Sequence, residues 1–341
     1  MVTDVRRENK LDIAITLLHI AGMIMIFLCH VFQAEKIYFV SEILISGVPL
    51  FLFVSGYLAG LKNIAHPLSW FLKKAKRILV PYWIFIVLIY GSYGILNLSS
   101  VTPFQWIFSL LDLQGLNYTY WKFEYFGAVE GCGHLWFVTT IMLCYALTPL
   151  MQRIKSKASS KISFTIWSVV LFGLQLIFIY LGFQLSYVFT FFLGFLLAGK
   201  EWRKGNKHYL YITMLMAAFM GIRLVARRFV DGTDFYDRFW ALVSATAIAA
   251  WLFYTVYYFK NKIGRVFELL NCRVVHFIEK ISYCFYITHY IFLWGPYSVF
   301  HYIDNKWIGY IVVAAFSFIS AIILYYLTER IIFVFLKRKK V

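Results

Sequence analysis

Residues 11–33 read LDIAITLLHIAGMIMIFLCHVFQ, an apolar run long enough to cross a membrane as one α-helix. His19 and His30 interrupt this run, and the spacing between them returns the chain to within about 20° of the same helix face. Asp12, seven residues before His19, lies on that face as well. Ionisable side chains inside a membrane are costly, so they usually mark a polar pathway or a functional site. We therefore expect a polar stripe along the first membrane-spanning helix.

The composition of the whole chain favours an all-α integral membrane protein. Of its 341 residues, 62% are hydrophobic and only 14% are charged, and the mean hydropathy is +0.72. These values exclude an ordinary soluble domain. We predict one polytopic membrane domain over 1–341, with about ten transmembrane helices at about 11–33, 39–61, 79–97, 135–151, 162–182, 184–199, 209–226, 239–259, 281–303 and 307–335.

The net charge of +17 is explained by topology better than by nucleic-acid binding. With the N-terminus in the cytoplasm, most Lys and Arg residues fall in the loops on the inner side, and few fall in the outer loops. This asymmetry is the positive-inside rule, and it predicts that both termini are cytoplasmic. We expect a multi-pass protein of the cell membrane in contact with lipid, an uncleaved first span, and no nucleic-acid partner.

The cysteines indicate neither a disulfide framework nor a zinc site. They follow no CxxC pattern, and most lie in or beside apolar spans, where cysteine behaves as a small hydrophobic residue. We expect no metal. The cysteines are Cys29, Cys132, Cys144, Cys272 and Cys284.

The longest outer loop, 98–134, combines aromatic rings with carboxylates such as Asp112 and Glu130. Aromatic rings stack on sugars, and carboxylates bind hydroxyl groups, so the loop suits a carbohydrate. An interfacial belt of aromatic residues explains it equally well.

Besides the histidines of the first span, four motifs contain residues that suggest a function. In the first span, a neutral imidazole can act as a general base, although histidines that only bond neighbouring helices are an equal alternative. The basic run of Lys73, Lys74, Lys76 and Arg77 precedes Pro81-Tyr82 and suits phosphate binding, but positive-inside charge also accounts for it. The other motifs are GVPLFLFVSGY at 47–57, GHLWF at 133–137, which holds His134, and SYCFYITH at 282–289.

In this order, the motifs resemble those of acyltransferase family 3, integral-membrane enzymes that O-acylate cell-surface glycans. The resemblance covers nearly the whole chain. Asp12, His19 and His30 match the family's Asp, its Arg or Lys, and the His that follows after ten further residues. His19 departs from the pattern, because the family has a permanent cation there, thought to meet the acyl-CoA donor, and histidine is only partly charged at neutral pH.

The resemblance implies an acyl-CoA donor, in the first instance acetyl-CoA, and a glycan or lipid-linked sugar as acceptor. It implies catalytic roles for His30, with Glu130 as the group that orients it, and for His134, which would bind the acceptor or polarise the thioester. The residues expected to bind the donor are His19, Lys73, Lys74, Lys76, Arg77, Ser282 and Tyr283. The resemblance also implies a protein partner, either in glycan synthesis or on the extracytoplasmic side of the membrane.

Two other classes of function stay open at this point. A transporter or flippase for glycans or lipid-linked sugars would share the helices and the polar stripe, but would need no acyl donor. A structural partner of a glycan-synthesis complex would tolerate the loss of His30. The residues leave open the acceptor, the acyl group, the ester or amide linkage, a direct or relayed transfer, and the oligomeric state.

Overall fold

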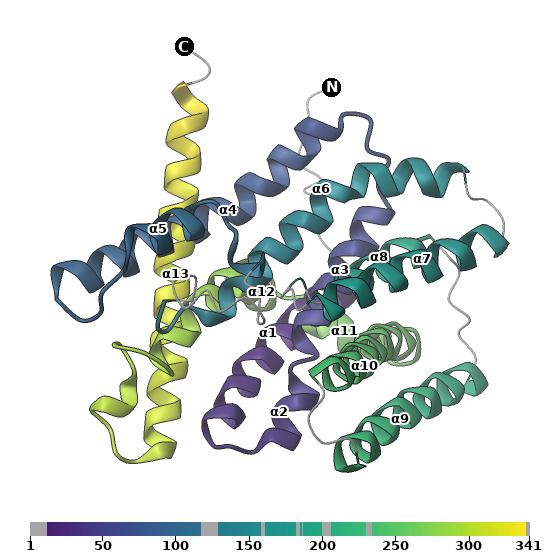
Figure 1. Ribbon diagram of the computed structural model, residues 1–341. Coiled ribbons are helices and arrows are strands. Elements are labelled where there is room, and N and C mark those ends of the chain that lie inside the picture. Colours follow the sequence, from purple (N-terminus) through teal and green to yellow (C-terminus); the bar gives the residue numbers. More distant parts are fainter. Residues whose placement is uncertain are drawn as a thin grey trace.

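The computed structural model describes residues 12–116, 129–157, 161–181, 185, 187–199, 206–229 and 234–338 (Figure 1). These residues form helices and connecting turns, with no strand among them, so the predicted all-α class is confirmed. The longer helices are α1 (Ile13–Ala34), α3 (Gly47–Gly60), α4 (Pro67–Ile95), α6 (Trp136–Lys157), α7 (Lys161–Tyr180), α9 (Asn206–Phe229), α10 (Asp234–Lys262), α12 (Arg273–Thr288) and α13 (Lys306–Arg338). The shorter ones are α2 (Tyr38–Leu44), α5 (Pro103–Leu110), α8 (Val188–Leu197) and α11 (Gly264–Leu270), with 3-10 turns at η1 (Gln114–Leu116), η3 (Gly133–Leu135), η4 (His289–Phe292) and η5 (Val299–His301).

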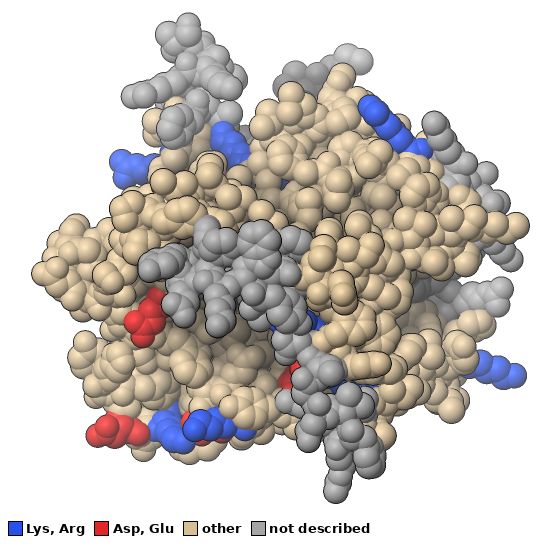
Figure 2. Space-filling model, in the orientation of Figure 1, with Lys and Arg blue, Asp and Glu red and all other residues tan. Residues whose placement is uncertain are grey.

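Within the described part of the chain, seven helical segments are long and apolar enough to cross a membrane. They are Ile13–Ala34, Tyr38–Gly60, Pro67–Ile95, Gly133–Ser156, Asn206–Val225, Phe235–Lys262 and Lys306–Val334. In Figure 2, most of the visible charge lies near two opposite margins, with few charged side chains visible between them. This distribution suits a membrane protein, while the count of ten helices and the cytoplasmic termini stay predictions.

The predicted span 281–303 is not a single helix in the structure. The sequence suggests a helix over 281–303, whereas α12 begins earlier, at Arg273, and ends at Thr288. The chain then continues through the short turns η4 and η5. Gly295, with φ of 91°, adopts a left-handed conformation and is followed by a proline, and neither feature fits a continuous helix. The interruption leaves His289 and Tyr290 in a turn.

Small residues set the closest helix contact, between α3 and α8. A Cβ atom on Gly56 would collide with the carbonyl of Phe191, and one on Gly194 would collide with the carbonyl of Phe53. Gly60 is equally close to the carbonyl of Phe195. Helices in a membrane associate mainly by such close packing. Lipid tails are as apolar as the side chains, so no hydrophobic effect drives the helices together. Gly56, within the 47–57 motif, therefore packs α3 against α8.

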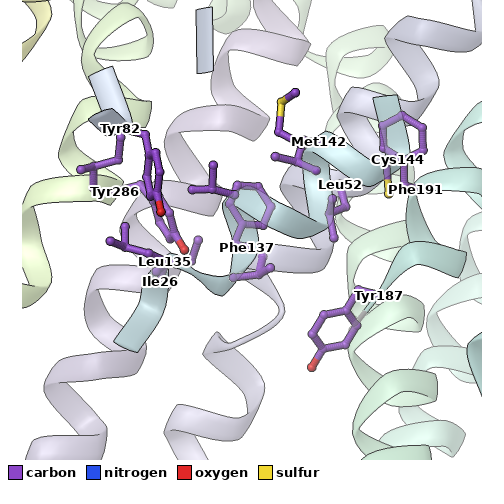
Figure 3. Packing of buried hydrophobic residues seen from close by; sticks show 14 of the residues in the cluster. Ile26, Leu52, Tyr82, Leu135, Phe137, Met142, Cys144, Tyr187, Phe191 and Tyr286 are labelled. Carbon is purple, nitrogen blue, oxygen red and sulfur yellow. The ribbon is translucent and has the colours of Figure 1, made fainter. Parts of the chain in front are cut away.

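The core connects these helices to the site. Figure 3 shows buried side chains from α1, α3, α4, η3, α6, α8 and α12, including Ile26, Tyr82, Leu135 and Tyr286. Contacts between α1 and α12, and between α12 and α13, hold the two halves of the chain together. Asp12 anchors the start of α1, because its carboxylate accepts from the amide of Ala14 and pairs with Lys260 of α10 at 2.6 Å.

Candidate functional site

Three histidines from distant parts of the chain meet in one cluster. His30 comes from α1, His134 from η3 and His289 from η4. The His289 ring lies 5.3 Å from that of His30 and 5.2 Å from that of His134, measured between centroids. His134 and His289 are buried, whereas His30 is only partly buried. The structure thus brings together the histidines of three separate sequence motifs, and we call them the histidine cluster.

The hydrogen bonds of the cluster fix which nitrogen of each ring carries hydrogen. A carbonyl oxygen only accepts, so the ring nitrogen facing it must donate. His134 donates through Nε2 to the carbonyl of Ile287 at 3.0 Å, and His289 donates through Nδ1 to that of Tyr286 at 2.7 Å. His134 Nδ1 and His289 Nε2 are then lone-pair nitrogens, and both are buried without a hydrogen-bond partner among the described residues.

Gln33 orients His30. Its side-chain oxygen accepts from His30 Nδ1 at 2.8 Å, one helical turn further along α1, which leaves Nε2 of His30 as the basic nitrogen. The sequence suggested Glu130 for this role. Glu130 is exposed, and its backbone carbonyl accepts a hydrogen bond from the Tyr93 hydroxyl at 3.1 Å. The partner of His30 in the structure is thus a neutral amide, and a role for the Glu130 carboxylate stays a prediction that no described contact supports.

The tautomers also limit what His134 can do. Its neutral ring presents a lone pair to the cluster, and a lone pair accepts a hydrogen bond from a hydroxyl but cannot stabilise a carbonyl oxygen. Of the two roles expected for His134, the geometry favours contact with an acceptor hydroxyl over polarisation of a thioester.

His19 lies further along α1 and pairs with α12. Its Nδ1 is 3.0 Å from Oε1 of Glu279, and its ring stacks on Phe51 with a centroid distance of 5.7 Å. Both partners of the pair are largely buried, at 14% and 8% exposure. Arg77 is close enough to attract the Glu279 carboxylate. The polar stripe predicted from the sequence thus runs from α1 onto α12 and toward the basic run of α4.

The basic run is only partly gathered at one place. Partial desolvation lowers the pKa of Lys62 below its usual value, and the charges of Lys74 and Arg77 lower it further. Lys74 also lies over the ring of Tyr145 at 4.8 Å. Lys62, Lys74 and Arg77 therefore form what we call the basic cluster. Lys73 is exposed and Lys76 is partly buried on the same helix, and no recorded contact joins either to it.

Ser282 and Tyr283, expected to bind the donor, are used within the fold. The Ser282 hydroxyl donates to the carbonyl of Glu279 at 2.7 Å, and the Tyr283 hydroxyl donates to that of Ile78 at 3.0 Å. The second bond fixes α12 against α4 next to Arg77. Their structural role is clear, and donor contact stays a prediction.

A second buried polar network adjoins the aromatic loop. Asp112 accepts from Thr139 at 3.1 Å, and Thr139 accepts from the amide of Gly115 at 2.9 Å. Burial raises the pKa of Asp112 to about 8, and the hydrogen bond from Thr139 offsets part of this rise. Residues 117–128 of the loop, including Trp121 and Glu124, lie outside the described residues.

In the described residues, no group of three or more His, Cys, Asp and Glu side chains has the geometry of a metal site. The site residues that the sequence did not single out are Gln33, Lys62, Glu279 and Tyr290. Gln33 follows His30 by three residues, a spacing that places both on one helix face, so this partner was readable from the sequence. The others required the fold.

The described residues form a helical membrane protein with a histidine cluster and a separate basic cluster. Comparison with protein families gives its class: the family model described as an acyltransferase domain matches residues 12–326. The chain belongs to acyltransferase family 3. No curated protein and no solved structure matches it.

Proposed function

We propose that this membrane acyltransferase moves an acyl group, in the first instance acetyl, from cytoplasmic acyl-CoA to a hydroxyl of an extracytoplasmic or lipid-linked glycan. The observation that carries this proposal is the basic nitrogen of His30, oriented by Gln33 within a buried cluster. A partly exposed imidazole held in one tautomer is suited to remove a proton from an acceptor hydroxyl near neutral pH.

The basic cluster supports a polyanionic donor. Three positive charges lie together in this cluster, from Lys62, Lys74 and Arg77, and they repel one another. The phosphates of a bound donor would neutralise them and make the arrangement favourable. Arg77 links this cluster to the Glu279–His19 pair, partway along α1 toward His30. His19 and His30 are separated by roughly 16 Å along the helix. We assign the phosphates of the donor to the basic cluster and its thioester to the histidine cluster.

The reaction needs one base. His30 Nε2 takes the proton of the acceptor hydroxyl as the oxygen attacks the thioester carbon, and then returns it to the departing thiolate. His134 Nδ1 and His289 Nε2 offer two further lone pairs for the remaining hydroxyls of a sugar. A location in the cell membrane and a partner that delivers the glycan belong to the same proposal.

The test supplies labelled acetyl-CoA to membranes that contain the protein and follows label into alkali-labile product on the endogenous glycan. Label above that of membranes without the protein supports the proposal. Absence of label with folded protein contradicts it, and a glycan-transport assay then tests the transporter alternative.

A further inference from the structure

Tyr290 packs against the histidine cluster, in contact with His30 and His134. Its ring centroid is 4.7 Å from that of His30, edge to face, and 4.8 Å from that of His134, stacked. Tyr290 is only partly buried, like His30 and unlike His134. The tyrosine and the general base therefore stand together at the accessible side of the cluster.

The hydroxyl of Tyr290 differs from those of its neighbours. Tyr283 and Tyr286 donate to the carbonyls of Ile78 and His134, and Tyr297 donates to the Ser92 hydroxyl at 2.7 Å. Among the described residues, none accepts a hydrogen bond from Tyr290. The other tyrosines are thus held by the fold, whereas the Tyr290 hydroxyl is free to bond a substrate.

Acyl transfer requires a hydrogen-bond donor beside the base. When an oxygen attacks the thioester, negative charge collects on the carbonyl oxygen, and a donor already in place lowers the barrier. The cluster's imidazoles cannot supply that donor, because their N–H groups bond Gln33, Ile287 and Tyr286. The nearby Thr288 hydroxyl is also occupied, since it donates to the carbonyl of Cys284 at 3.0 Å. Of the described rings that contact His30, those of His289 and Tyr290, only the phenol of Tyr290 has a donor left for a substrate.

We propose that the Tyr290 hydroxyl donates a hydrogen bond to the thioester carbonyl oxygen and to the oxyanion formed from it. This assignment rests on the proposed acyl transfer. As the acceptor oxygen bonds the carbonyl carbon, His30 takes its proton, and the carbonyl electron pair moves to the oxygen that Tyr290 holds. The carbonyl then re-forms, the carbon–sulfur bond breaks, and the thiolate takes the proton from His30. Tyr290 keeps its own hydrogen throughout.

Tyr290→Phe tests this role, because it keeps the ring and its contacts and removes only the donor. We expect kcat for acetyl transfer to fall about 100- to 1000-fold, the effect of losing one oxyanion donor. Binding of S-ethyl-CoA, a thioether without the carbonyl, should change less than about twofold, since the variant loses no ground-state contact with it. Tyr297→Phe is the matched control, because it loses a structural hydrogen bond and should stay within about threefold of the wild type.

Three outcomes overturn the proposal. A Tyr290→Phe enzyme within about fivefold of wild-type kcat would show that the hydroxyl is dispensable. If the fraction of protein that binds S-ethyl-CoA falls as much as the activity does, the variant is misfolded and the hydroxyl has a structural role. Absence of transfer by the wild type would instead refute the proposed function on which the assignment rests. This outcome is distinguishable from the other two because it is observed with the wild type alone.

Discussion

His19 and Glu279 form a buried pair that joins the first half of α1 to the middle of α12, with Nδ1 of His19 3.0 Å from Oε1 of Glu279. In the resemblance to acyltransferase family 3, a permanent cation is expected at position 19. Here a histidine and a carboxylate stand together instead, and Arg77 supplies the permanent charge nearby. The departure at position 19 is therefore matched by a partner on another helix.

Removal of one member of this pair should destabilise the protein strongly. His19→Leu leaves the buried Glu279 carboxylate unpaired, which costs about 3–5 kcal/mol in comparable sites. The double variant His19→Leu, Glu279→Leu should recover much of this loss, because no charge is then left buried. Denaturant unfolding in detergent measures both. Lys306→Ala, which breaks the exposed pair with Glu35, is the control and should cost at most about 1 kcal/mol. Additive losses in the double variant would contradict the coupling.

Gln33 should matter for rate rather than for donor binding. Gln33→Leu removes the acceptor at His30 Nδ1, so the ring is no longer held with Nε2 as the base. We expect kcat to fall about 10- to 100-fold, the range for leaving a buried donor unpaired. Gln33→Glu keeps an acceptor oxygen and should retain most of the activity. Initial rates at saturating acetyl-CoA measure this effect. A leucine variant with wild-type rates would show that Gln33 does not orient His30.

Asp112 should make stability depend on pH. Burial raises the pKa of its carboxyl to about 8 in the folded protein, whereas the unfolded chain releases this proton near pH 4. Between these values the folded state binds more protons at this carboxyl than the unfolded state, so the contribution of Asp112 to stability is largest below pH 4 and is lost as the pH rises toward 8. The slope from this group reaches about 1.4 kcal/mol per pH unit. Asp112→Asn should make the melting temperature depend less on pH between pH 5 and pH 8. An unchanged slope of melting temperature against pH would show that the carboxyl is not buried as described.

The helical fold and the meeting of His30 with His134 were predictable from sequence, but for different reasons. Long apolar runs such as 11–33 predict helices because the membrane leaves few alternatives for the backbone. The convergence of His30 and His134 followed only from a resemblance, since no local rule places residue 134 beside residue 30. The end of α12 at Thr288 was missed because hydropathy continues through 289–303 while the backbone does not.

The remaining site residues depended on tertiary packing. Glu279 lies 260 positions from His19 and falls between the predicted spans 239–259 and 281–303, so its pairing could not be read from spacing. The free hydroxyl of Tyr290 is visible only after the partners of the neighbouring tyrosines are known. The choice between Gln33 and Glu130 likewise required the geometry, although the spacing of His30 and Gln33 on one helix was available.

The most direct measurement compares His30→Ala with the wild type in the labelled acetyl-CoA assay at equal amounts of folded protein. His301→Ala is the matched control, because His301 is exposed in η5 and takes no part in the proposed site. The account predicts that His30→Ala loses at least about 100-fold in transfer, the range of general-base catalysis, while His301→Ala transfers at the wild-type rate. Wild-type transfer by His30→Ala would contradict the assignment of His30 as the base.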